Sequence, residues 1–268
     1  MPTPIPTNYQ LYLDPLLGFT PGGTAWLDQS VGENNFTFNN TSYTYENTIG
    51  SFYLNETFET EINEDVRPGT LPIGTSAISI IAWIKIVNDG PDNSNFSVFQ
   101  IGRNPAGTDY QMIALGNSST GPFSGNYYQY LTVNNNSGYR VANAPADSLP
   151  FDTWVMVSYT KPASGTVASQ RLYIDGVEIS SYSTVNGTGV VNTSLAAGSN
   201  SMVRINNFAP VGVKTTTSAS IGQFWVYDQE LSAADMLNFY ETTQPRYYPA
   251  PPAPDLSDGR SFGQGFSG

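Results

Sequence analysis

The chain has 268 residues and a formal net charge of −12, and it contains neither cysteine nor histidine. Disulfides, catalysis by cysteine or histidine, and metal sites built on thiolate or imidazole ligands are therefore excluded, which leaves carboxylate, hydroxyl or calcium chemistry. Lys and Arg number only ten and form no cluster, so we expect no binding to nucleic acid or to an anionic membrane surface.

The composition favours an all-β protein of one domain. Charged residues make up 12% of the chain, while Tyr, Phe, Asn, Ser, Thr and Gly are abundant, as in strands joined by polar turns. The length fits one antiparallel β-sandwich with tails. We predict an extended arm over residues 1–7, the sandwich over 8–243 and a second arm over 244–268. The first residues have no basic or apolar region typical of a secretion signal.

The N-terminal part is predicted to contain short strands. Pro2, Pro4 and Pro6 disfavour both helix and regular ladder pairing, so the first residues are expected to be extended. A strand over Tyr9–Leu13 should begin the sandwich. Between residues 34 and 54, aromatic and polar residues alternate repeatedly, which predicts short strands joined by Asn-rich turns.

An acidic segment follows, with five acidic residues between positions 56 and 65. Glu59, Glu61 and Glu64 are candidates for a general acid and base, but such carboxylates must be held rigidly about 5–10 Å apart around the scissile bond. Arg67, Pro68 and Gly69 indicate a loop instead. We interpret the segment as a solvated acidic loop.

Four strands are predicted in the middle of the chain, at residues 78–87, 96–101, 110–115 and 127–133. The last is rich in tyrosine, a side chain that suits sugar stacking and protein contacts but is also common on half-buried sheet faces. The candidate contact residues for a glycan or a partner are Tyr127, Tyr128, Tyr130 and Tyr139.

The clearest local signal is a strand followed by a hairpin. Residues 154–159 alternate between two faces, which predicts a strand in a sheet. Arg171–Ile174 predicts another strand, and Asp175-Gly176 supplies the two positive-φ residues of a type I′ turn before Val177.

The C-terminal part should close the sandwich and then leave it. Val190-Val191 and Met202–Ile205 are short strand candidates, and residues 220–228 predict the closing core strand. Ser232 and Asp235 predict the capping box of a short helix, which would pack on the sandwich through its apolar residues.

Beyond the helix, residues 244–268 are rich first in Pro and then in Gly and Phe, as linkers are. We expect this arm to contact neighbouring chains. The alternative is a tail folded back on its own sandwich. The candidate anchors of the arm are Tyr247, Tyr248, Phe262 and Phe266.

Four motifs together resemble the laminin G-like, concanavalin A-like jelly-roll family. They are Leu11–Asp28, the strand Ile80–Ile86, the Trp154 strand with its hairpin, and residues 222–240, GQFWVYDQELSAADMLNFY. The first motif resembles the opening of such domains in viral and phage structural proteins. The resemblance covers roughly residues 8–242 and implies a β-sandwich with one short C-terminal helix.

The resemblance implies three classes of function, since lectins, glycosidases and passive scaffolds share this fold. The acidic segment lacks the strand-borne carboxylate pattern of laminarinase-type glycosidases, so we expect no enzyme. We interpret the chain as a structural protein of a virion surface, a decoration or fibre component whose arms contact subunits of the same assembly. The alternative is a carbohydrate-binding module, which would be extracellular or serve host attachment.

The resemblance also implies a calcium site, because laminin G-like domains often bind one ion at the rim of the sandwich. The candidate ligands here are loop carboxylates, but their spacing does not match a dense calcium loop. They are Asp89, Asp92, Asp109 and Asp152. No other cofactor is expected.

Overall fold

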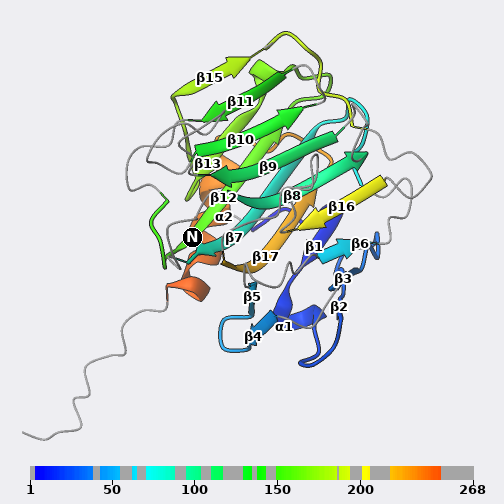
Figure 1. Ribbon diagram of the computed structural model, residues 1–268, viewed down its shortest axis with the longest axis vertical. Coiled ribbons are helices and arrows are strands. Elements are labelled where there is room, and N and C mark those ends of the chain that lie inside the picture. Colours follow the sequence, from blue (N-terminus) through cyan, green and yellow to red (C-terminus); the bar gives the residue numbers. More distant parts are fainter. Residues whose placement is uncertain are drawn as a thin grey trace, which may run out of the picture.

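The computed structural model describes residues 4–38, 43–54, 62–64, 71–87, 95–103, 110–116, 129–134, 138–142, 149–185, 187–193, 201–205 and 218–248. The described strands pair in an antiparallel manner and form two sheets, which lie one behind the other in Figure 1. The predicted β-sandwich with a C-terminal helix is therefore confirmed. No helix within these ranges is long and apolar enough to cross a membrane.

Eight of the described strands form the first sheet, which we call sheet A. Its order is β14 (Val177–Glu178), β13 (Arg171–Ile174), β12 (Trp154–Lys161), β7 (Ile78–Ile86), β17 (Ala219–Tyr227), β5 (Ser51–Leu54) and β4 (Tyr43–Glu46), with β1 (Leu11–Leu13) also paired to β17.

Nine of the described strands form the second sheet, which we call sheet B. It is the nearer sheet in Figure 1. Its order is β15 (Tyr182–Val185), β11 (Gly138–Ala142), β10 (Gln129–Asn134), β9 (Tyr110–Gly116), β8 (Asn95–Arg103), β16 (Ser201–Ile205), β6 (Ile62–Glu64), β3 (Phe36–Phe38) and β2 (Ala25–Trp26). The described helices are α1 (Pro15–Gly18), a 3-10 turn (Val167–Ser169) and α2 (Ala233–Tyr247).

Most predicted strands are present within a residue or two of their expected ends, and two expectations are corrected. The acidic segment is not wholly a loop, because Ile62–Glu64 forms β6, which pairs with β3 and β16. Residues Val190-Val191 form no strand, since Val190 makes only an isolated bridge to Thr166.

Both faces of the central strands of sheet A are buried. On β12, Val155 and Val157 face the core between the sheets, while Trp154 and Met156 belong to a second apolar cluster on the outer face. Helix α2 supplies Met236 and other residues to that second cluster. This arrangement explains why every residue of β12 and β17 is buried.

Helix α2 begins as predicted but is longer than expected. Ser232 and Asp235 form the predicted capping box. The helix continues to Tyr247, whose side chain is only 5% exposed and stacks on Trp83 with ring centroids 4.3 Å apart. The boundary expected at residue 243 is therefore wrong, and Tyr247 is part of the chain's own core rather than an anchor for a neighbour. The Tyr248 hydroxyl likewise donates to the carbonyl of Trp154 in the same sandwich.

The segment before β1 also packs on the outer face of sheet A. Ile5 packs against the second cluster, and the hydroxyl of Tyr227 donates to the Pro6 carbonyl at 2.8 Å. The arm expected over residues 1–7 is thus held by its own domain at Ile5 and Pro6. Phe262 and Phe266, the other expected anchors, lie outside the described residues.

A partly buried ion pair joins the two ends of the described chain. Arg246 on α2 binds both carboxylate oxygens of Asp14, at 2.7 and 2.8 Å. Asp14 also caps α1 through the Leu16 amide and accepts from Gln223 on β17. Burial alone would raise the pKa of Asp14, but the hydrogen bonds and the charge of Arg246 outweigh it and lower that pKa. The ionised pair is therefore the stable form in the folded protein.

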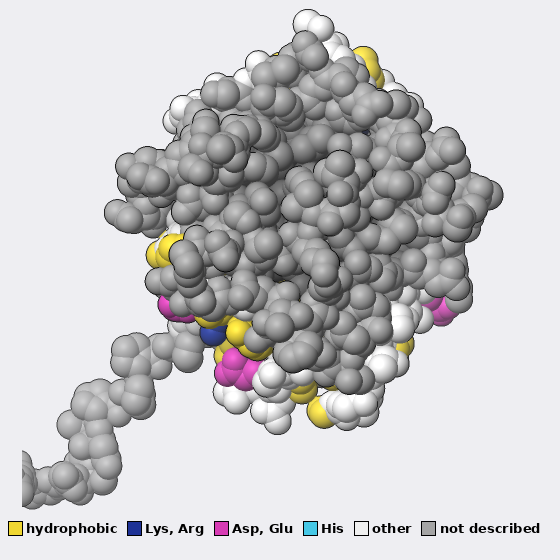
Figure 2. Space-filling model, viewed as in Figure 1, with side chains coloured by type: hydrophobic (Ala, Val, Ile, Leu, Met, Phe, Trp, Pro, Cys, Tyr) yellow, Lys and Arg dark blue, Asp and Glu magenta, His cyan; other side chains and the backbone are white. Residues whose placement is uncertain are grey.

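A few aliphatic side chains remain exposed near α1. Leu16 is 44% exposed, Leu17 66% and Leu27 46%. The amide of Leu27 donates to the Gly18 carbonyl at 2.7 Å, so Leu27 is adjacent to α1 in space. In Figure 2, hydrophobic side chains reach the surface at the lower rim, close to where α1 lies in Figure 1. We call these three residues the α1 patch.

Replacing Arg246 by Met should destabilise the fold by about 3–5 kcal/mol, because it leaves the buried Asp14 carboxylate without a counter-charge. Urea unfolding measures the loss. The pair's contribution should be complete above the ordinary aspartate pKa of 3.8 and disappear as the pH falls through the lower pKa of folded Asp14.

The matched control is Arg171→Met, which removes an exposed ion pair to Glu178 and should cost less than about 1 kcal/mol. The double variant Arg246→Met with Asp14→Asn should lose less unfolding free energy than the sum of the losses of its two single variants. Additive losses would show that the Asp14–Arg246 pair does not hold the ends together.

Candidate functional site

The tyrosines expected to contact a glycan lie only partly in the described part of the chain. Tyr130 lies on β10 and Tyr139 on β11, two strands that pair in sheet B. Tyr127 and Tyr128 lie outside the described residues. A contact role for these tyrosines stays a prediction.

The expected carboxylate sites are not assembled within the described part of the chain. Asp152 is exposed in the turn before β12, and Asp89, Asp92 and Asp109 lie outside the described residues. Among the residues that the structure describes, no group of three acidic side chains is placed to hold a metal ion. Glu64 belongs to β6, whereas Glu59 and Glu61 are not described.

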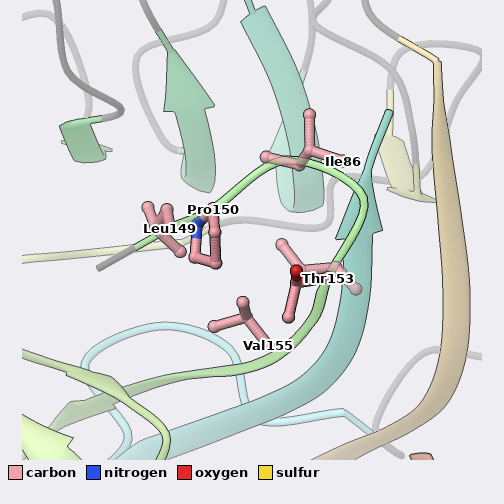
Figure 3. A pocket seen from close by; sticks show the side chains of 6 residues that line it. Ile86, Leu149, Pro150, Thr153 and Val155 are labelled. Atoms are coloured by element: carbon pink, nitrogen blue, oxygen red, sulfur yellow. The ribbon is translucent and has the colours of Figure 1, made fainter. Parts of the chain in front are cut away.

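Two further features are closed to ligands. Burial lowers the pKa of Lys161 to about 8, a value that suits a base, but the side chain is 1% exposed and donates to the Ser76 carbonyl. An apolar hollow between β7 and the turn before β12 has no room for a water molecule. It is lined by Ile84, Ile86, Leu149, Pro150, Thr153 and Val155, most of which are labelled in Figure 3.

A groove of about 310 Å³ lies open to solvent on the outer side of sheet A, within the described part of the chain. The β13–β14 hairpin forms one wall, and the segment that leads into α2 forms the other. We call it the hairpin groove. Its lining residues are Arg171, Tyr173, Glu178, Glu230, Leu231, Ser232 and Ala233.

The hairpin turn places one wall of the hairpin groove against the helix. Asp175 and Gly176 have φ values of 50° and 78°, the positive pair predicted for a type I′ turn. The Asp175 carboxylate accepts the Met156 amide at 2.8 Å, which fixes the turn to β12. A Cβ on Gly176 would lie 2.7 Å from the Cα of Leu237, so only glycine allows the turn to pack this closely on α2.

The groove combines a buried floor with charged walls. Tyr173 and Leu231 are 2% and 3% exposed and form the floor. Above them, Arg171 and Glu178 form an ion pair at 2.7 Å, which raises the pKa of Arg171. Glu230 is exposed on the opposite wall. The groove therefore offers carboxylate acceptors and a guanidinium donor above aromatic and aliphatic carbon.

The sequence contained part of the signal for this groove. A two-residue turn at Asp175-Gly176 fixes the hairpin register, which places Glu178 opposite Tyr173 and close to Arg171. The contribution of Glu230 and Ser232 could not be found in this way, because they are more than 50 residues away in the sequence and meet the hairpin only through the packing of α2.

A sequence comparison decides the family. The model of the Concanavalin A-like lectin/glucanases superfamily matches residues 59–236, which is well over half of the chain. The chain belongs to this superfamily. A search of curated proteins finds no match.

Solved structures with the concanavalin A-like fold include receptor-binding domains of toxins. The binding domain of botulinum neurotoxin serotype D is 14% identical, with a TM-score of 0.55, and the match covers 88% of this chain and 51% of that one. The serotype D ligand-binding domain in complex with N-acetylneuraminic acid gives the same values. The serotype G binding domain is 13% identical, with a TM-score of 0.55 and coverages of 88% and 51%. The chain thus spans about half the length of these proteins, and the likeness concerns the fold.

Replacing Gly176 by Ala should destabilise the protein and disrupt the hairpin groove, because the new methyl group meets the backbone of α2. Gly22→Ala is the matched control, since Gly22 has a φ of 82° but a Cβ added there would meet no atom within 4 Å. Both variants carry the strain of a positive φ, about 1 kcal/mol. Gly176→Ala should lose about 1–3 kcal/mol more free energy of unfolding than Gly22→Ala, as measured with urea. Equal losses would mean that the hairpin does not depend on close contact with α2.

Proposed function

We propose that the chain is a non-catalytic carbohydrate-binding module that binds sugar in the hairpin groove. The observation that carries the proposal is the composition of the groove, which places polar groups of fixed orientation above buried carbon. Sugars have the same two-sided character, with hydroxyl groups around an apolar ring face. At about 310 Å³, the groove is at the lower end of the range for small-molecule sites.

The two carboxylates of the groove suit sugar binding better than glycoside hydrolysis. Glycoside hydrolysis needs two carboxyl groups held rigidly on either side of the scissile bond. Glu230 is exposed to solvent, and Glu178 accepts from the guanidinium of Arg171. Both carboxylates can accept hydrogen bonds from sugar hydroxyls.

Membership of the concanavalin A-like superfamily supports the same proposal, because that superfamily includes lectins as well as glucanases. A similar fold was also solved in complex with N-acetylneuraminic acid. Both relations support sugar binding.

The full chain should bind at least one sugar of an oligosaccharide array, with saturable heat in calorimetry and a Kd below about 1 mM, or about −4 kcal/mol. It should release no reducing ends from β-glucans at acid or neutral pH. Absence of binding across the array would refute the proposal. Release of reducing ends would show instead that the protein is a glycoside hydrolase.

The second candidate function is a structural subunit of a virion surface, in which copies of this chain contact one another. The α1 patch favours it, because three exposed leucines on adjacent segments make an apolar surface suited to a second copy. Sugar binding and virion display are compatible, since a surface subunit can also attach to host glycans.

Light scattering after size exclusion should give a defined oligomer for the full chain and a smaller species for Leu17→Ser combined with Leu27→Ser. The substituted side chains are exposed, so the monomer fold should persist, as checked by circular dichroism. The matched control is Val31→Ser, which changes a side chain that is 96% exposed but outside the α1 patch. A monomeric full chain would remove the support for assembly through this patch.

A further inference from the structure

We infer that the hairpin groove selects neutral sugars and rejects acidic ones such as sialic and uronic acids. The inference rests on the proposed function and concerns the charge of the ligand. Two features support it, namely the excess of carboxylates at the groove and the capping of the α2 N-terminus by a carboxylate.

Negative charge exceeds positive charge at the groove. The lining contains one guanidinium, that of Arg171, and two carboxylates, those of Glu178 and Glu230. The guanidinium is already engaged by Glu178 at 2.7 Å. An acidic sugar would bring its carboxylate close to Glu178 and Glu230, where the charge of Arg171 is already balanced by Glu178. A neutral sugar can donate hydroxyls to both carboxylates and leave the ion pair intact.

The N-terminus of α2 does not offset this excess. A helix N-terminus normally attracts anions through its free amides and its dipole. Here the carboxylate of Asp235 accepts both the Ser232 amide at 2.8 Å and the Ser232 hydroxyl at 2.6 Å. The Ser232 hydroxyl in turn accepts the Asp235 amide. The helix end thus has its own carboxylate, which is a third negative group beside the groove.

The net charge of −12 acts in the same direction over longer distances. Its effect on a bound ligand is screened by salt, with a Debye length of about 8 Å at physiological ionic strength and about 3 Å at 1 M. The carboxylates that line the groove are closer to a bound sugar and are screened less. Repulsion by the groove carboxylates can therefore be distinguished from repulsion by the net charge of the protein. Added salt weakens the second more than the first, and removing one charge inside or outside the groove tests them separately.

The test is calorimetry of the full chain with neutral disaccharides and their acidic counterparts. The pairs are lactose with 3′-sialyllactose, and cellobiose with cellobiouronic acid. We expect the neutral member of a binding pair to bind at least about tenfold more tightly than the acidic one at physiological salt. This ratio should fall, but stay above one, at about 1 M NaCl.

Glu230→Gln keeps the size of the side chain and removes one local charge. It should lower the neutral-to-acidic affinity ratio by about threefold or more. Glu241→Gln is the matched control, because it makes the same change in net charge at an exposed position of α2 outside the groove lining. It should leave the ratio unchanged.

The outcomes separate this inference from the proposed function. Equal or tighter binding of the acidic sugars overturns the inference and leaves sugar binding intact. An equal effect of Glu230→Gln and Glu241→Gln also overturns it, since the selection would then come from net charge alone. If no neutral or acidic sugar binds at all, the proposed function fails, and the inference fails with it.

Discussion

The ion pair between Asp14 and Arg246 is the constraint on which the arrangement of the outer face of sheet A depends. Arg246 lies near the end of α2 and Asp14 directly after β1, so the pair ties the helix to the strand that extends the sheet. The tie is possible because β17 has a bulge between Ile221 and Phe224. There, the Gln223 side chain reaches Asp14 at 2.9 Å and the Gln223 amide donates to the Tyr247 hydroxyl at 2.8 Å.

The bulge explains why a glycine, Gly222, lies inside a buried strand. A Cβ on Gly222 would lie 2.3 Å from the Tyr247 hydroxyl, so a larger residue would push the last turn of α2 away from the sheet. With that turn in place, Tyr247 covers Trp83 and both faces of the central strands are dry. The helix therefore acts as a third layer of the sandwich.

Local signals in the sequence were sufficient for most of the strands, the type I′ hairpin and the capping box, because each depends on neighbours within a few residues. The end of α2 could not be predicted in this way. Pro245 and the Pro-rich residues after it are typical of a linker, and the contacts that keep Arg246 and Tyr247 helical come from Asp14, Gln223 and Trp83.

The same packing determines where a ligand can bind on this side of the molecule. Helix α2 covers the outer face of sheet A from its capping box to Tyr247, and the surface left open beside its first turn is the hairpin groove. Gly176 brings the hairpin against the helix, so the distance between the two walls is fixed by the fold rather than by the ligand. Because the capping box uses Asp235 to satisfy the helix end, the folding signal itself adds negative charge beside the groove. The charge preference of the site is in this sense a consequence of how the helix begins.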